Sequence, residues 1–257
     1  MLYTDHTSSD LARLASKAIA VLPLAAIEQH GNHLPVATDT AIADELARRV
    51  EAALPKRVML LPTLWCGSSH HHRGFPGALS ISSETYTRVI EDLLDCLIES
   101  GFRRIFLLNC HGGNQTPFAE ALYRVNLRHP EPWVAAASYW NLAAKELAAQ
   151  KFMETPKLSH ACEYETSLML RLRVDWVKPG RRGQTRHVVS KYYDPLNYVP
   201  SRVAVAQSFD QLSATGALGS PELATAEKGE SLFALLADSV VDFLHDFCTW
   251  KRPKMPR

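Results

Sequence analysis

The sequence lacks a long apolar run: no stretch of its 257 residues approaches the roughly 20 residues that a membrane-spanning helix needs. It also lacks a basic block longer than the pair Arg181-Arg182, and its formal net charge is only +1. Proteins that bind nucleic acid or an anionic membrane surface concentrate basic residues in a patch. The sequence therefore predicts neither a nucleic-acid partner nor a membrane partner.

Cysteine is scarce, and the five cysteines form no Cys-x-x-Cys pair. They are odd in number and widely spaced, which favours free thiols in a reducing compartment over a disulfide framework. The N-terminus carries acids at Asp5 and Asp10 and lacks the basic segment of a signal peptide. We expect a cytoplasmic protein.

Hydrophobic residues make up 46% of the chain, which is enough for a packed core. Strand-like and helix-like segments alternate. Strands are predicted at 18–26, 57–61, 104–109 and 133–138, and helices at 39–53, 84–100, 114–128, 141–150, 160–172 and 220–247. The segment 175–219 is irregular, with one or two short strands expected near 187–190 and 203–205. This alternation predicts the α/β class, with a mostly parallel sheet covered by helices on both faces, in a single domain of residues 1–257.

Two histidines and two acids fall within residues 28–39, directly after the first predicted strand. Glu28 and His30 are two residues apart, and side chains at this spacing point the same way in extended chain. Ligands of parallel sheets bind beyond the carboxyl ends of the strands, which is where this stretch lies. Asp39 falls at a predicted helix start, and a simple capping role stays open for it.

A second polar stretch is Asn109-Cys110-His111-Gly112-Gly113-Asn114, at the end of the third predicted strand. The two glycines permit a tight turn and a close approach of the backbone to a ligand. The helix that follows offers free N–H groups at its N-terminus. An ordinary strand-to-helix turn would also need the glycines, but it would not need His111.

The third stretch is Ser159–Ser167, which contains one histidine and two glutamates. If the predicted helix begins at residue 160, His160 and Glu163 share a face at the i, i+3 spacing, and Glu165 points elsewhere. A solvated polar first turn is the alternative interpretation of this stretch.

Together the three stretches supply two imidazoles and three carboxylates, from Glu28, His30, Asp39, His111 and Glu163. Such ligands suit Zn²⁺, Mn²⁺ or Fe²⁺ and not a copper–thiolate centre. Three carboxylates and one hydroxide would balance the charge of two divalent ions. The set therefore predicts a dinuclear centre with a metal-activated water.

The sequence resembles the creatininase (creatinine amidohydrolase) family in six segments that occur in the family's order. They are LPLAAIEQHGNHLPVATDT, HHRGFPGALSI, LLNCHGGN, SYWN, HACEYETSLML and GALGSPELATAEKG, and they extend from Leu22 to Gly229. The resemblance implies a three-layer α/β/α fold, a dinuclear metal centre and hydrolysis of an amide-type bond. It also implies a homo-oligomer, with a hexamer favoured.

The resemblance further implies roles for individual metal ligands. Glu28 and His111 would hold one metal ion, His30 would hold the other, and Asp39 would bridge them. We expect two divalent ions per chain, zinc in the first place, with manganese and iron as alternatives.

Creatininase has its remaining carboxylate two residues after the equivalent of His111, where this chain has Gly113. We expect Glu163 to replace it. By the same resemblance, His160 is the catalytic residue that transfers the proton, and Glu165 is a nearby acid that orients it.

The resemblance places His72, Trp140, Gly112 and Gly113 at the substrate, whereas the run His70-His71-His72 is not expected to bind metal. Trp140 matches one tryptophan of the creatinine pocket, and the other has no counterpart. The HGGN variant occurs in members that deformylate a formamidopyrimidine or trim a peptide in cofactor maturation. We therefore predict hydrolysis of a C–N bond in a small-molecule amide, formamide or cyclic amide other than creatinine. A peptide-trimming hydrolase, or a binding module without turnover, is the alternative.

Overall fold

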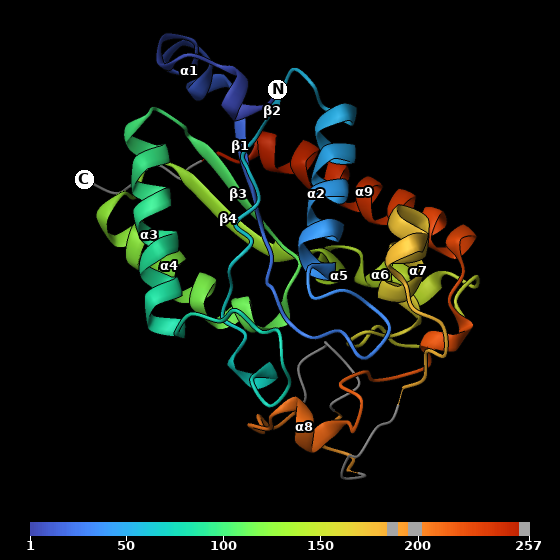
Figure 1. Ribbon diagram of the computed structural model, residues 1–257. Helices are drawn as coiled ribbons and strands as arrows, with labels where there is room; N and C mark the ends of the chain where they lie inside the picture. The colour runs from blue at the N-terminus through green and yellow to red at the C-terminus, as the bar shows by residue number, and fades with distance from the viewer. Residues whose placement is uncertain (184–189, 195–201, 252–257) are drawn as a thin grey trace.

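The computed structural model describes residues 1–183, 190–194 and 202–251. At its centre lies a parallel sheet with the strand order β2-β1-β3-β4 (Figure 1). The strands are β1 (Ile19–Leu24), β2 (Val58–Leu60), β3 (Arg104–Asn109) and β4 (Trp133–Ser138). These four strands confirm the four main strands predicted from the sequence.

The helices largely follow the predicted segments. They are α1 (Ser8–Leu14), α2 (Thr38–Ala53), α3 (Ser83–Glu99), α4 (Gln115–Arg128), α5 (Tyr139–Leu142), α6 (Ala144–Ala149), α7 (Glu163–Arg173), α8 (Phe209–Leu212) and α9 (Ala226–Thr249). The predicted helix 220–247 begins later than expected, because Pro221–Leu223 forms a separate 3₁₀ turn and Thr225 caps α9. The described residues 202–205 form no strand, and 187–189 lie outside the described ranges.

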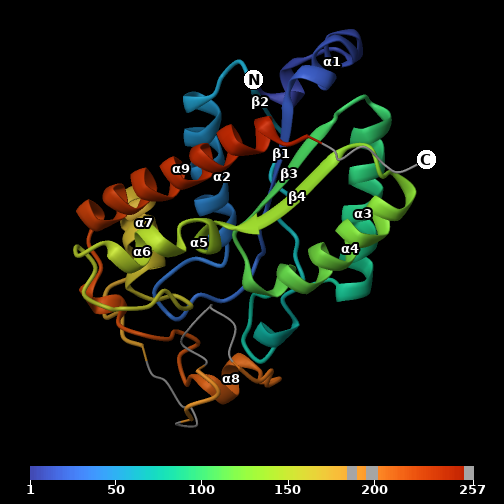
Figure 2. The same ribbon diagram turned by 180° about the vertical axis from the view of Figure 1, so that it is seen from behind.

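The two central strands are buried on both faces, as expected of a parallel sheet between helices. Their side chains alternate between two cores. Ile19, Val21, Phe106 and Leu108 pack with α2, α7 and α9, whereas Ala20, Leu22, Leu24, Ile105 and Leu107 pack with α3 and α4. Figures 1 and 2 show these two helical layers on opposite faces of the sheet. The fold is a three-layer α/β/α sandwich, as predicted.

The register of the sheet aligns the carboxyl ends of three strands. Leu24 of β1 pairs with Asn109 of β3, which pairs with Ser138 of β4. The Asn109 side-chain amide donates to the Ser138 hydroxyl at 2.9 Å and to the main-chain oxygen of His111 at 2.7 Å. The loops after β1 and β3 are thus held side by side, and the polar stretches predicted from the sequence meet there.

All five cysteines are free thiols. Within the ranges that the structure describes, no helix combines the length and apolar character needed to cross a membrane.

Candidate metal centre

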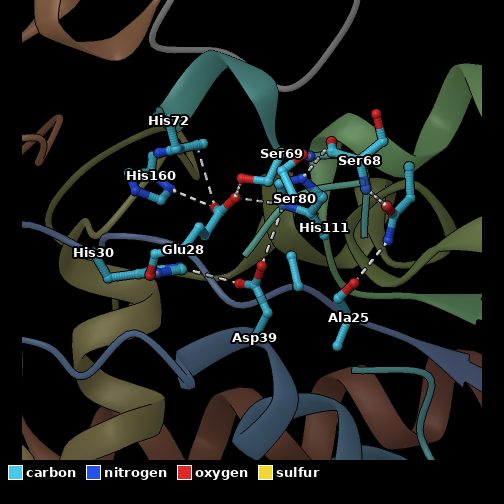
Figure 3. Close-up of polar contacts among 12 residues, drawn as sticks. Ala25, Glu28, His30, Asp39, Ser68, Ser69, His72, Ser80, His111 and His160 are labelled. Carbon is cyan, nitrogen blue, oxygen red and sulfur yellow. Dashed lines mark hydrogen bonds and ion pairs between the residues drawn. The ribbon is translucent and has the colours of Figure 1, made fainter. Parts of the chain in front are cut away.

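The carboxylate of Asp39 lies between two imidazoles (Figure 3). Its Oδ1 is 3.0 Å from Nε2 of His30, and its Oδ2 is 3.2 Å from Nδ1 of His111. Asp39 does not cap α2, because Ala37 occupies the N-cap position and the cap has no side-chain hydrogen bond. The capping alternative is therefore excluded, and each oxygen of the carboxylate faces one imidazole.

Main-chain oxygens fix which nitrogen of each imidazole carries a proton. His30 Nδ1 lies 3.2 Å from the main-chain oxygen of Glu28, and His111 Nε2 lies 3.1 Å from that of Ser68. A carbonyl oxygen only accepts, so these two nitrogens donate. In the neutral rings, the form that binds a metal, the unprotonated nitrogens then face Asp39. Metal-ligating histidines are oriented by this kind of second hydrogen bond.

Two further carboxylates lie beside these two imidazoles. Glu28 Oε2 lies 3.2 Å from His111 Nδ1 and accepts a hydrogen bond from the Ser69 hydroxyl. Glu165 Oε2 lies 4.0 Å from His30 Nε2. Each imidazole nitrogen that faces Asp39 therefore has one further carboxylate nearby.

The buried polar atoms of this cluster fit a cation. His30 Nε2 and Asp39 Oδ2 are buried, and among the described residues neither has a hydrogen-bond partner of acceptable geometry. Leaving such atoms unsatisfied costs free energy. A divalent ion beside each would satisfy both, and the nitrogen and oxygen donors suit zinc, manganese or iron.

The electrostatics of the cluster also favour positive charge. Burial alone would lower the pKa of His30, but the carboxylates of Asp39, Glu165 and Glu28 outweigh it and raise that pKa to about 9. For His111, too, burial is outweighed by Glu28 and Asp39, so the pKa is raised. Burial raises the pKa of Glu165. The cluster thus attracts protons to its imidazoles, as a carboxylate-rich cation site does.

The structure does not bring Glu163 to this cluster, which corrects the prediction that Glu163 is a metal ligand. Glu163 Oε1 accepts from Lys228 Nζ at 2.6 Å, and Oε2 accepts from the main-chain N–H of Thr155 at 2.7 Å. Residues two apart on a helix point in nearly opposite directions. Glu163 therefore faces α9, and Glu165 is the acid that faces His30.

His160 does belong to the cluster, but for a different reason than predicted. It precedes α7, and the backbone turns at Ala161, whose φ is +49°. His160 Nε2 donates to the main-chain oxygen of Gln29 at 2.7 Å, and Nδ1 lies 3.6 Å from Glu28 Oε1. Glu165 Oε2 instead accepts from the main-chain N–H of Ala161. The orienting partner of His160 is therefore Gln29, where the sequence predicted Glu165.

Gly113 lies in a space too small for any side chain. A Cβ there would lie 2.0 Å from the main-chain oxygen of Ser68, 2.6 Å from His111 Nε2 and 2.7 Å from His71 Cε1. The His71 ring stacks on that of His111, with centroids 5.6 Å apart. The packing thus accounts for the missing carboxylate at position 113, and it involves His71, which the sequence analysis set aside.

The remaining predicted substrate residues are placed as follows. His72 is buried, with Nε2 at 3.3 Å from Glu28 Oε1, so it lies at the cluster. Trp140 packs edge-on against Tyr139 and belongs to the core beside α2 and α9. Gly112 begins the 3₁₀ turn that follows His111. Substrate contacts of these residues stay predictions.

Sequence reasoning missed several polar residues that build the site. The Asn114 amide donates to the main-chain oxygen of Ala25 at 3.0 Å and accepts from the main-chain N–H of Ser68 at 3.0 Å. It thereby ties the loops after β1 and β3 to the segment that carries Ser69. The amide at the end of HGGN was the available signal, because a glycine turn alone does not need it.

Comparison with known proteins finds relatives that match nearly the whole chain. Residues 4–244 match the sequence model of a family described as creatininase, creatinine amidohydrolase. A creatinine amidohydrolase of Pseudomonas putida is 27% identical over 246 residues, which cover 90% of this chain and 90% of the relative. A mycofactocin precursor peptide peptidase of Mycobacterium tuberculosis is 31% identical over 250 residues, which cover 91% of this chain and 87% of the relative.

A solved structure of creatinine amidohydrolase (creatininase) shares the fold. It superposes with a TM-score of 0.78 at 24% identity, covering 97% of this chain and 98% of that chain. The architecture around the sheet is therefore common to both molecules.

Proposed function

The chain belongs to the creatininase family, and on that premise we propose that it is a metal-dependent hydrolase of a C–N bond in an amide, formamide or cyclic amide. The observation that carries the proposal is the Asp39 carboxylate, which presents one oxygen to His30 and the other to His111. A carboxylate shared in this way is the ligand that a pair of metal ions needs.

In this proposal each of two divalent ions has three protein ligands. Glu28, His111 and Asp39 would hold one ion, and His30, Glu165 and Asp39 would hold the other. Zinc is the expected metal and manganese the alternative, because similar solved creatininases include a Zn-Zn form and a manganese form. Iron also suits these nitrogen and oxygen donors.

Bound divalent ions would supply a water of lowered pKa and polarise the carbonyl of the substrate. The chain's own contribution is proton transfer by His160. Its Nε2–H is held by the main-chain oxygen of Gln29, so only Nδ1 can take up or release a proton. Nδ1 accepts a proton as the water oxygen bonds to the carbonyl carbon. It returns that proton to the nitrogen as the C–N bond breaks, which is general acid–base catalysis.

Peptide hydrolysis is the second candidate for the same site. The 31% identity to a mycofactocin precursor peptide peptidase supports it, and that relative covers 91% of the chain. A peptide bond and a small amide need the same activated water and the same proton at nitrogen, so the two candidates differ in substrate size and not in chemistry.

A substrate screen of metal-loaded protein tests the proposal. The protein is loaded with Zn²⁺ or Mn²⁺ and offered formamidopyrimidines, small cyclic amides, short peptides and creatinine, with product detected by mass spectrometry. We expect metal-dependent turnover of one of the first three classes and negligible turnover of creatinine. Metal-dependent binding without turnover of any compound would instead support a binding module.

We also propose that the protein is a single domain that assembles into a homo-oligomer, with a hexamer favoured. The family resemblance supports this assembly, and a mass measurement in solution tests it.

A further inference from the structure

Gln29 is a buried amide, 5% exposed, between two imidazoles of the candidate site. Its Nε2 lies 2.8 Å from Nδ1 of His72. It also lies 3.1 Å from Nε2 of His160, but this approach is not a hydrogen bond, because the His160 Nε2–H donates to the main-chain oxygen of Gln29 at 2.7 Å. Gln29 separates two proposed metal ligands in the sequence, yet its own side chain turns away from them. None of the roles assigned above explains a buried amide at this position.

Two main-chain groups settle the orientation of the Gln29 amide. The N–H of Gly31 donates to Oε1 at 2.8 Å, and Nε2 donates to the main-chain oxygen of Gly216 at 3.1 Å. If the amide were flipped, both contacts would set like groups against each other. The backbone of Gly216 packs directly on this amide, since a Cβ there would lie 1.9 Å from Oε1.

This orientation decides the tautomer of His72. An amide nitrogen only donates, so His72 Nδ1 must accept the Gln29 hydrogen bond and cannot carry a proton of its own. The proton of the neutral ring then sits on Nε2, which faces Glu28 Oε1 at 3.3 Å. Phe209 stacks on the ring with centroids 3.9 Å apart, and this packing opposes a flip that would exchange the two edges.

The main chain of Gln29 decides the tautomer of His160. Its carbonyl oxygen accepts from His160 Nε2 at 2.7 Å, which leaves Nδ1 unprotonated in the neutral ring. The two rings therefore present opposite groups to Glu28 Oε1. His72 presents an N–H, and His160 presents a lone pair at 3.6 Å.

Glu28, His72 and His160 have ligand atoms within 4.8 Å of one another, which is the spacing of a cation site. A metal there would need the lone pair of His72 Nε2, and the Gln29 hydrogen bond places a proton on that atom.

We propose that Gln29 is a positioning residue that fixes His72 as an N–H donor, keeps it out of the metal shell, and leaves His160 Nδ1 as the proton-accepting atom. The proposal deepens the function proposed above. Only the roles of the two histidines in turnover rest on that proposed function. The hydrogen bonds themselves exist in the metal-free protein and can be tested there.

The test is ¹⁵N NMR of metal-free protein labelled in its histidine rings, which distinguishes pyrrole-type nitrogen (protonated) from pyridine-type nitrogen (unprotonated). The signals are assigned by their loss in His72→Gln and His160→Gln. We expect pyridine-type Nδ1 and pyrrole-type Nε2 for both rings of the wild type. In Gln29→Glu the carboxylate accepts instead of donating, so His72 Nδ1 should become pyrrole-type. His160 should stay unchanged, because its partner is the main chain.

Gln115→Glu is the matched control. Gln115 donates to the Ser138 hydroxyl at 3.0 Å, and this substitution adds the same charge without changing the partner of either imidazole. If Gln29→Glu does not fold, Gln29→Met removes the donor at similar size and should give His72 a mixture of tautomers. A wild-type His72 protonated on Nδ1, or an unchanged His72 in every folded Gln29 variant, would overturn the proposal. Turnover does not enter this test, so failure of the proposed function is a separate result.

Discussion

Glu163 and Lys228 form a buried ion pair that joins α7 to α9, with Oε1 and Nζ 2.6 Å apart. The Glu163 side chain is fully buried and that of Lys228 is 14% exposed. Burial alone would raise the pKa of Glu163, but hydrogen bonds from Lys228 and Thr155 outweigh it and hold the pKa below its ordinary value. Glu163 is thus a structural anion, although it stands only two residues from the acid that faces the candidate metal centre.

The first prediction compares the two acids of α7 by the same substitution. Glu165→Gln removes a proposed ligand and should lose one metal ion per chain. Glu163→Gln should keep both ions but lower the melting temperature, because it leaves Lys228 without its buried partner. Such a loss costs roughly 1–3 kcal/mol. Each kcal/mol corresponds to ~2–4 °C for a chain of this size.

Elemental analysis and thermal unfolding of both variants check this prediction. Metal loss from Glu163→Gln with full retention in Glu165→Gln would restore the interpretation made from the sequence.

The second prediction concerns metal content. Protein purified without chelator should approach two divalent ions per chain by elemental analysis. Removing them should lower the melting temperature, because ions that bind only the native state stabilise it by ~2.7 kcal/mol at one hundred times their dissociation constant. Adding Zn²⁺ or Mn²⁺ back should restore it, and Mg²⁺ at equal concentration should do so less. One ion per chain at saturation would contradict the bridging role of Asp39.

The third prediction separates proton transfer from metal binding. His160→Ala should keep both metal ions and lose turnover by about 10²–10⁴-fold on substrates with a poor nitrogen leaving group. Substrates with a good leaving group should lose less, because their nitrogen departs without a proton. Rates on a matched pair of such substrates check this, together with metal content. Loss of an ion from the variant would make His160 a ligand.

The fourth prediction concerns Gly113. Gly113→Ala places a methyl group 2.0 Å from the Ser68 oxygen, and that contact is with backbone that cannot swing away. Overpacking of this kind costs roughly 1–3 kcal/mol. We expect a lower melting temperature and weaker metal binding, since the displaced segment also holds His111. Combining it with His71→Ala should recover little, because the Ser68 contact remains. Full recovery in the double variant would assign the clash to His71.

The fifth prediction is a pH dependence of stability. Glu230 accepts hydrogen bonds from Arg49 and Arg171, and these outweigh burial and lower its pKa from 4.5 to about 2. A lowered pKa stabilises the fold above pH 4.5, and this contribution is lost as the pH falls toward 2. Since Glu230 is 47% exposed, the contribution is at most ~1 kcal/mol.

The free energy of unfolding of wild type and Glu230→Gln, measured by urea denaturation between pH 7 and pH 2, checks this dependence. The difference should be largest at neutral pH and vanish near pH 2. A difference that grows toward acid would contradict the sign.

The sheet and most helices could be predicted from the sequence because their signals are local. A buried strand appears in the sequence as an apolar run. The bounds of two strands, Arg104–Asn109 and Trp133–Ser138, were therefore predicted to the residue. The start of α7, which determines the acid that faces the candidate site, was predicted three residues too early. The helix predicted from residue 160 begins at Glu163, because Ala161 takes a left-handed backbone conformation that no propensity for alanine suggests.

Because of this three-residue difference in the helix start, Glu163 was predicted at the site where the structure has Glu165. A helix starting at His160 would have placed Glu163 beside it, whereas the observed start turns Glu163 toward Lys228. Residues Glu28, His30, Asp39 and His111 were brought together as predicted, since each follows a strand end or opens a helix at one edge of the sheet. Lys228 could not be foreseen as a partner, because an ion pair between distant segments leaves no local pattern.

The cluster at the sheet edge draws its groups from segments that are far apart in the sequence, with Glu28 in the loop after β1 and Glu165 on α7. With the ligand set proposed above, neither the loop after β1 nor α7 supplies all the ligands of two ions before the other has docked. Ions held by both segments would therefore bind the native state and not a chain in which α7 has yet to dock. An interaction absent from the folding transition state slows unfolding and leaves the folding rate nearly unchanged. We expect bound ions to lower the unfolding rate of this protein and to leave its folding rate nearly unchanged.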